Sequence, residues 1–174
     1  MNEDFDKIIM SKKNKTTTPE QAFFRVAHIC SQKECCIFDI KQKLRRKELS
    51  DAEIEQIINK LIDEKYIDET RFTRSFIADK LRFNKWGAQK IKNHLRAKFV
   101  PTTIIENAFS EIENELLTKA LPDLLEKKRK SVSGKSEYEI NTKLIRYALG
   151  KGFMMSDVLK CLKSMNINDL PDDM

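Results

Sequence analysis

The sequence predicts an all-α protein, arranged as an elongated, curved array of three tandem three-helix modules, and three observations lead to this prediction. Apolar residues recur at three- and four-residue steps, which is the period of an amphipathic helix and not of a strand. Only four Gly and four Pro occur in 174 residues, too few for the many turns of a β-sandwich. The third observation is an internal repeat of about 50 residues.

The repeat is visible when the chain is aligned with itself. An apolar pattern returns at an offset of 51 and then at a further offset of 54. The three copies are Ile40, Leu44, Leu49 and Ile54; Ile91, Leu95, Val100 and Ile105; and Ile145, Leu149, Met154 and Leu159. In each copy one helix carries the first two residues, a turn follows, a second helix carries the last, and a longer helical segment precedes the pair. Such a unit buries little surface alone, so stacking against its neighbours should supply much of its stability.

The modules follow one another along the chain. We expect a flexible tail at 1–17, module 1 at 18–66, module 2 at 67–112, module 3 at 113–166 and a second tail at 167–174. Pro19 suits the first turn of the first helix. Ser50 with Glu53 forms a capping box, and Pro101 opens the equivalent helix of module 2.

Two features of module 3 determine where its helices begin and end. Gly150 and Gly152 are expected to end the helix that precedes them. Pro122 either kinks the first helix of the module or starts a new helix at 121–130. The sequence leaves this choice open.

Charge is segregated along the chain. The total of 33 Lys and Arg against 27 Asp and Glu gives +6, with a pI near 9.1. Residues 71–100 hold nine bases and one acid, or +8, whereas 48–69 carry −6 and 101–125 carry −4. A second basic block at 126–151 carries +5. The basic middle module would attract a phosphate backbone or an acidic surface. The alternative is an ordinary solvated helix face, but such faces mix both signs and this stretch contains almost no acids to pair.

The candidate residues for binding nucleic acid or a partner all lie in this basic stretch. They are Arg71, Arg74, Lys80, Arg82, Lys85, Trp86, Lys90, Lys92, Arg96 and Lys98. Aromatic residues lie between them, so stacking on unpaired bases is conceivable. The spacing of Phe72, Phe76 and Phe99 predicts core positions. The sequence leaves two interpretations of Trp86 open, packing of the module or contact with a ligand.

Signals for catalysis are absent, since the chain has no Gly-rich phosphate loop, HExxH or GxSxG motif. We therefore expect a binding protein that is not an enzyme and uses no cofactor. His28, Cys30, Cys35 and Cys36 cluster, but without a CxxC or a second ligand pair they predict buried, reduced thiols and no metal site. No secretory signal opens the sequence and no apolar run approaches the ~18 residues of a membrane span, so we expect a cytoplasmic protein.

Three stretches of the sequence carry a recognisable pattern. Tyr66 to Phe72 (YIDETRF) resembles the Y-[LI]-D-[DE]-x-R-[FY]-A segment of the RecX family. Trp86 to Ile91 (WGAQKI), followed by Leu95 and Lys98, resembles G-x-x-[KR]-I-x-x-x-L-x-x-[KR]-G-[IV]. Leu149 to Phe153 (LGKGF) resembles the closing L-x-x-[KR]-G-[FY]. The departures are Phe99 at the glycine of the middle turn, Thr73 in place of alanine, and Cys35-Cys36 in place of an aromatic residue and serine.

This resemblance implies a regulator of RecA recombinase that binds the RecA-DNA filament along its groove and suppresses strand exchange and ATP hydrolysis, in recombination, DNA repair and the SOS response. The implied partners are the RecA filament and single- and double-stranded DNA, with no membrane, and the chain is expected to be a monomer. We expect six bases to contact phosphates or acidic residues, namely Arg71, Arg74, Arg82, Lys85, Lys92 and Arg96, held in place by Phe72, Phe76, Ile91 and Leu95.

Two other functions remain open on the sequence alone. One is a helix-turn-helix transcription regulator, because each module ends in two short helices. Its recognition helix would begin Pro101-Thr102-Thr103 and soon carry Glu106, a poor choice for reading bases in the major groove. The other is a helical-repeat scaffold that binds only proteins.

Overall fold

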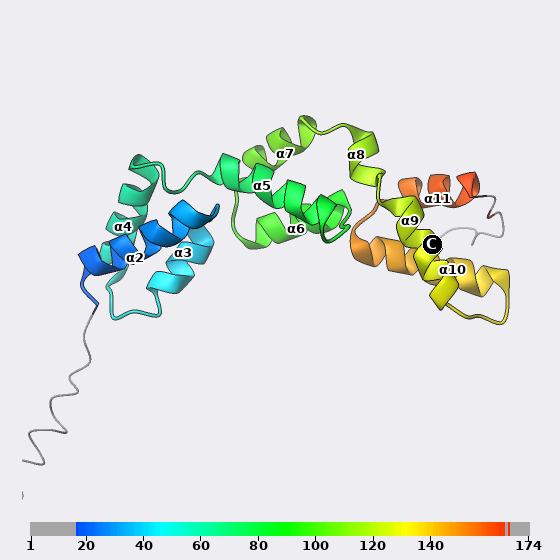
Figure 1. Ribbon diagram of the computed structural model, residues 1–174, viewed down its shortest axis with the longest axis horizontal. Helices are drawn as coiled ribbons and strands as arrows, with labels where there is room; N and C mark the ends of the chain where they lie inside the picture. The colour runs from blue at the N-terminus through cyan, green and yellow to red at the C-terminus, as the bar shows by residue number, and fades with distance from the viewer. Residues whose placement is uncertain (1–16, 166, 168–174) are drawn as a thin grey trace, which may run out of the picture. The chain divides into compact units, whose positions relative to one another are not determined.

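The structure is a computed structural model that describes residues 17–165 and 167 (Figure 1). Within these residues the only regular secondary structure is the α-helix, which confirms the predicted all-α class. Apart from Thr17 and Ile167, the tails expected at 1–17 and 167–174 lie outside the described residues. Contacts along the chain define two compact units, Met1–Asp68 and Glu69–Met174, which are described in turn.

The first unit is a three-helix bundle. Its helices are α2 (Pro19–Gln32), α3 (Ile37–Leu44) and α4 (Asp51–Asp63). Helix α2 begins as predicted, with Pro19 in its first turn and the Thr18 hydroxyl accepting the Gln21 N–H at 3.2 Å. The predicted capping box of α4 is confirmed: the Ser50 hydroxyl accepts the Glu53 N–H at 3.3 Å, and Glu53 Oε2 accepts the Ser50 N–H at 2.8 Å.

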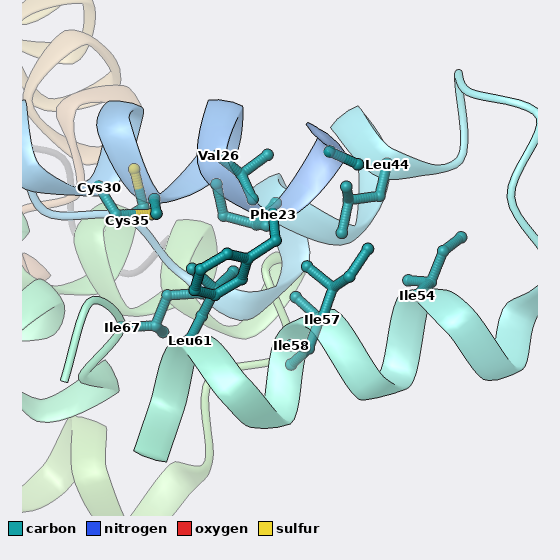
Figure 2. Close-up of a cluster of buried hydrophobic side chains, with 13 residues drawn as sticks. Phe23, Val26, Cys30, Cys35, Leu44, Ile54, Ile57, Ile58, Leu61 and Ile67 are labelled. Atoms are coloured by element: carbon teal, nitrogen blue, oxygen red, sulfur yellow. The ribbon is translucent and has the colours of Figure 1, made fainter. Parts of the chain in front are cut away.

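The core of this unit is formed by one apolar face from each helix (Figure 2). Its buried residues include Phe23 and Val26 of α2, Ile40 and Leu44 of α3, and Ile54, Ile57, Ile58 and Leu61 of α4. Burying each large aliphatic or aromatic side chain contributes about 1.5–3 kcal/mol. The helical spacing of these residues in the sequence therefore accounts for the bundle.

All four cysteines are buried, as the sequence predicted. Cys30 and Cys35 lie together in the core of the first unit (Figure 2). Burial raises the pKa of the Cys30 thiol to about 12, and the neighbouring Cys35 thiol adds to the shift. Burial likewise raises the pKa of Cys161 in the second unit. The Cys30 and Cys161 side chains are therefore neutral packing groups at physiological pH.

The second unit contains two three-helix bundles joined by a short helix. The middle bundle comprises α5 (Glu69–Arg82), α6 (Ala88–Ala97) and α7 (Thr102–Ser110); α8 (Asn114–Thr118) follows; and the last bundle comprises α9 (Leu121–Ser131), α10 (Glu137–Lys151) and α11 (Met155–Ser164). Pro122 occupies the first turn of α9, so the structure selects a new helix over a kink. The tandem three-helix modules are thus confirmed, while their exact boundaries stay predictions.

The predicted alignment of the third repeat was wrong by one residue. Ile91, Leu95, Val100 and Ile105 are all buried, and the buried residues that match them in the last bundle are Leu144, Ala148, Phe153 and Val158, at an offset of 53. The residues chosen from the sequence fit less well, because Leu149 and Met154 are 36% and 59% exposed. The error arose because Ala148 is small and its neighbour Leu149 is more apolar, so the pattern shifted by one position.

The turn after α6 explains a second error. Phe99 was expected in the core, but its side chain is 78% exposed and its φ is +59°, in the left-handed region. The helix has ended by this point, so helical spacing no longer predicts where a side chain lies. Val100 is buried instead, and its N–H donates to the Leu95 carbonyl at 3.2 Å. The expected core position of Phe72 is confirmed, whereas Phe76 is only half-buried.

Helices α6 and α10 cap each other through main-chain atoms. The N–H groups of Gly87 and Gln89, at the start of α6, donate to the carbonyls of Lys151 and Gly152 at 2.9 and 3.0 Å. Helix starts leave N–H groups without partners and helix ends leave carbonyls, so each satisfies the other and their dipoles attract. We call this contact the seam between the two bundles.

Two glycines make the seam possible. A Cβ at Gly87 would lie 2.3 Å from the main chain of Gly152, and a Cβ at Gly152 would lie 2.3 Å from Lys90 Cβ. Gly152 also has a φ of +92°, the left-handed conformation that ends α10. Gly150, which the sequence also marked as a helix end, lies inside α10 and is exposed.

Candidate nucleic-acid interface

The ten candidate residues lie on α5, on α6 and in the turns that follow them. Arg71, Arg74, Lys80 and Arg82 belong to α5; Lys85 and Trp86 to the connection; Lys90, Lys92 and Arg96 to α6; and Lys98 to the cap of α6. None of them is fully buried. Arg71 is exposed on the first turn of α5, and Lys98 is half-buried. The remaining eight fall into three groups.

The first group surrounds Trp86. The ammonium groups of Lys80 and Lys90 lie 5.4 and 5.0 Å from the centroid of the indole ring, close enough for cation–π attraction. The His94 ring lies 4.4 Å from the same indole, and its Nδ1 lies 2.9 Å from the Lys90 carbonyl oxygen. Trp86 is half-buried. It therefore packs α5 against α6 and still presents part of its ring to solvent. The structure is compatible with both interpretations of Trp86, packing and contact with a ligand.

The second group is paired with acids of α7 and of its C-cap. Arg74 donates two hydrogen bonds to Glu111, at 3.0 and 2.7 Å. Lys92 Nζ lies 2.5 Å from Glu106 Oε2, and Arg96 donates to the other oxygen of Glu106 at 3.4 Å. The Lys92 hydrogen bond, reinforced by the charges of Lys92 and Arg96, lowers the pKa of Glu106.

These ion pairs correct one expectation. The basic stretch contains few acids of its own, but its partners come from the following helix, which belongs to the acidic segment 101–125. Ion pairs between exposed side chains contribute about 0–1 kcal/mol and break readily when a stronger partner arrives. Glu106 and Glu111 thus hold three of the candidate cations in place without removing them from the surface.

The third group is Arg82 and Lys85 at the end of α5. Both are exposed, and the Arg82 guanidinium carbon lies 5.2 Å from the Phe83 ring centroid. Lys85 has a φ of +54°, so the chain turns sharply there toward α6. Together with Trp86 they line a groove of about 850 Å³ that continues onto the last bundle. The sequence alone did not predict this groove, because residues that are distant in sequence form it.

The part of the chain that the structure describes contains no cluster of three His, Cys, Asp or Glu side chains arranged to hold a metal ion. Of the four residues that cluster in the sequence, His28 is exposed while Cys30, Cys35 and Cys36 are buried. Across residues 17–165 and 167, every helix is too short or too polar to traverse a lipid bilayer.

Comparison with known proteins agrees with the sequence resemblance. Family models of the second and third three-helix domains of RecX match residues 68–108 and 119–162. The chain belongs to the RecX family. Similar curated proteins named regulatory protein RecX occur in Clostridium beijerinckii, 30% identical over 136 residues, and Bacillus mycoides, 28% identical over 135 residues.

The chain spans about half to just under two-thirds of the length of these RecX relatives. The alignments cover 75% and 78% of this chain but 63% and 49% of the relatives. Crystal structures share the fold: RecX from Lactobacillus salivarius is 22% identical, with a TM-score of 0.74 over 86% of this chain and 97% of that one. A second RecX crystal structure is 20% identical, with a TM-score of 0.73 over 83% of this chain and 71% of that one.

Proposed function

We propose that this protein is a non-enzymatic negative regulator of RecA recombinase, which binds the RecA-DNA filament through its basic middle bundle and inhibits strand exchange and ATP hydrolysis. Membership of a family of regulatory proteins supports the regulatory role. The observation that carries the binding mode is the +8 charge of residues 71–100, displayed on side chains that are exposed or half-buried.

The three groups of cations suit different parts of this task. Arg82 and Lys85 are exposed at a turn and would meet a phosphate first. Lys92 and Arg96 would exchange Glu106 for phosphate oxygens, which are stronger acceptors for charge-assisted hydrogen bonds. The cost is small because the existing pairs are solvent-exposed. The exposed part of Trp86 would stack on an unpaired base.

Salt dependence measures how many of these cations engage DNA. Each phosphate neutralised on a single strand contributes about −0.7 to the slope of log affinity against log salt, so six contacts would give a slope of about −4. If the cations that pair with Glu106 and Glu111 stayed on their carboxylates, only three of the six would remain, and the slope would be about −2. Affinity should not depend on base sequence, because phosphate contacts carry no sequence information.

The decisive experiment adds the purified protein to preformed RecA filaments and follows ATP hydrolysis. We expect inhibition by the wild type and at least about tenfold weaker inhibition by Arg82→Glu/Lys85→Glu, since two attractive charges become repulsive. The matched control is Lys160→Glu/Lys163→Glu, which makes the same change on exposed positions of α11. Equal inhibition by both double variants would refute the assignment to the middle bundle.

The same proteins distinguish the other functions. A preferred operator sequence would favour a transcription regulator, although Glu106, near the start of the presumed recognition helix α7, is turned toward α6 by its ion pairs. Absence of any DNA affinity, with inhibition retained, would favour a scaffold that contacts only protein.

A further inference from the structure

The groove of the second unit forms a surface of its own. It runs between α5 and α7 of the middle bundle and α8, α9 and the end of α10, with a volume of about 850 Å³. Its apolar lining is aliphatic for the most part and includes Ile77, Leu81, Ile112, Leu116, Leu117 and Leu124. Leu116 is 51% exposed, although a leucine of a helix next to a core is ordinarily covered.

Cations dominate the rim. Arg82, Lys85, Lys119, Lys127 and Lys151 line the groove, and none of them forms an ion pair with a described carboxylate. Arg74 and Glu111 also line it but neutralise each other, which leaves Asp123 as the one remaining acid among its lining residues. The rim is therefore strongly positive around an apolar floor.

The groove is also preformed. The seam fixes the middle bundle against the last one through the hydrogen bonds of Gly87 and Gln89, and Lys90 Nζ adds a bond to the Gly150 carbonyl at 3.1 Å. Main-chain contacts of this kind leave little freedom for the two walls to move apart. A ligand would thus meet a surface that requires little ordering on binding.

We infer that this groove binds an acidic amphipathic helix of a partner protein. Apolar side chains at i, i+3, i+4 and i+7 would enter the aliphatic floor, and Glu or Asp residues beside them would face the cations of the rim. The cations of the rim require a partner with negative charge, and the apolar floor requires a partner with apolar side chains. Unpaired bases stack on aromatic rings, but Trp86 and Tyr147 are the two aromatic residues of this lining and its aliphatic residues outnumber them, which favours the apolar face of a helix over bases.

The inference goes beyond the proposed function and does not require DNA binding. The groove shares Arg74, Arg82 and Lys85 with the candidate phosphate contacts, but Lys119, Lys127 and Leu116 belong to the groove alone. Variants at these three positions separate the two surfaces, so failure of one proposal can be recognised without failure of the other.

The test uses the full chain and synthetic fluorescent peptides of about 18 residues, which form five helical turns. One peptide carries Leu at i, i+3, i+4 and i+7 with Glu at the other positions, a second replaces Glu by Lys, and a third replaces Leu by Ala. Fluorescence anisotropy measures binding. We expect the Leu/Glu peptide to bind at least about tenfold more tightly than either of the others, because only it matches both the floor and the rim.

Variants locate the peptide. Leu116→Asn should weaken binding of the Leu/Glu peptide about tenfold, because half of this side chain is still available for burial. Lys119→Glu/Lys127→Glu should weaken it by at least as much. Leu149→Asn, on an exposed leucine of α10 outside the groove lining, is the control and should leave binding unchanged. Circular dichroism verifies that each variant is folded.

Three results would overturn the inference. One is equal binding of all three peptides, or of none. A second is an effect of Leu116→Asn on a single-stranded oligonucleotide but not on the peptide, which would assign the groove to nucleic acid. The third is tighter peptide binding after removal of residues 168–174, whose three Asp residues would then identify the chain's own end as the occupant.

Discussion

Glycine positions are the clearest case of single residues that determine the structure. Gly87→Ala should destabilise the second unit by about 2 kcal/mol or more, because its Cβ would force the seam apart and remove two main-chain hydrogen bonds. Gly150→Ala is the matched control. Nothing lies within 4 Å of its Cβ position, and alanine in a helix interior should stabilise by about 0.5–1 kcal/mol. Urea unfolding followed by the fluorescence of Trp86, the single tryptophan, measures both; similar effects of the two substitutions would contradict the seam.

Phe99 has a left-handed backbone conformation, which its side chain disfavours. Phe99→Gly should stabilise the second unit by about 0.5–1 kcal/mol, since glycine relieves the left-handed conformation at a modest cost in chain entropy. Lys98→Gly, one position earlier with an ordinary negative φ of −94°, should destabilise it by a similar amount, because glycine loses more chain entropy on folding. Thermal unfolding of the two variants gives shifts of opposite sign if the strain is real, and shifts of the same sign if it is not.

The Cys30 thiol sets an alkaline limit to the stability of the first unit. Its folded pKa is about 12, above the ordinary value of 9.0, so its contribution is fully present below pH 9 and is lost as the pH rises toward 12. Cys30→Ala should lower stability at neutral pH through lost packing and should also flatten this alkaline decline. Denaturant midpoints measured by circular dichroism across this range test the prediction. A decline of unchanged steepness in the variant would show that other groups cause it.

At the scale of elements, the contact between α6 and α7 controls how many cations are available. Glu106→Gln removes the carboxylate that Lys92 and Arg96 share, so both become free for phosphate. We expect higher affinity for a single-stranded oligonucleotide, and a salt slope that steepens by up to about −1.4 to the extent that Lys92 and Arg96 stay on Glu106 in the wild type. Glu113→Gln, an equal change of charge at an exposed position before α8, is the control and should have a smaller effect. An identical effect would mean that net charge alone matters.

The caps and ion pairs of three helices make stability depend on acid pH. Glu53 of the α4 capping box, Glu106 of α7 and Glu139 of α10 have lowered pKa values, caused first by hydrogen bonds from Ser50, Lys92 and Lys143 respectively. Their contributions are present above the ordinary pKa of 4.5 and are lost as the pH falls through the folded values. Glu53→Gln and Glu139→Gln should each lower the thermal midpoint at pH 7 and weaken its dependence on pH below 4.5.

Much of the element scale could be predicted from the sequence. Helical spacing predicted the all-α class, and Pro19 and the Ser50 capping box predicted helix starts, because these signals act over a few residues. The register of the last repeat failed at Ala148, where a small buried residue adjoins a larger exposed one. The predicted core position of Phe99 was wrong because helical spacing applies only within the helix, which ends before this residue.

At the scale of the whole molecule, the basic and acidic segments of the sequence form ion pairs with each other. The cations of α5 and α6 were predictable, but the acids that hold three of them come from α7, and the groove needs residues of the last bundle. Both depend on tertiary packing, which no local pattern encodes. The acidic segment 101–125 thus serves as internal counter-charge to the basic stretch as well as a flank.

The seam has a consequence for how such a protein can change over generations. Its two central hydrogen bonds join main chain to main chain, so mutation can alter the size, charge and polarity of nearly every surrounding side chain and leave the angle between the helices as it was. The two glycines at positions 87 and 152 are closed to larger residues. Recognition surfaces on the two bundles can therefore diversify while the joint that aligns them is inherited intact.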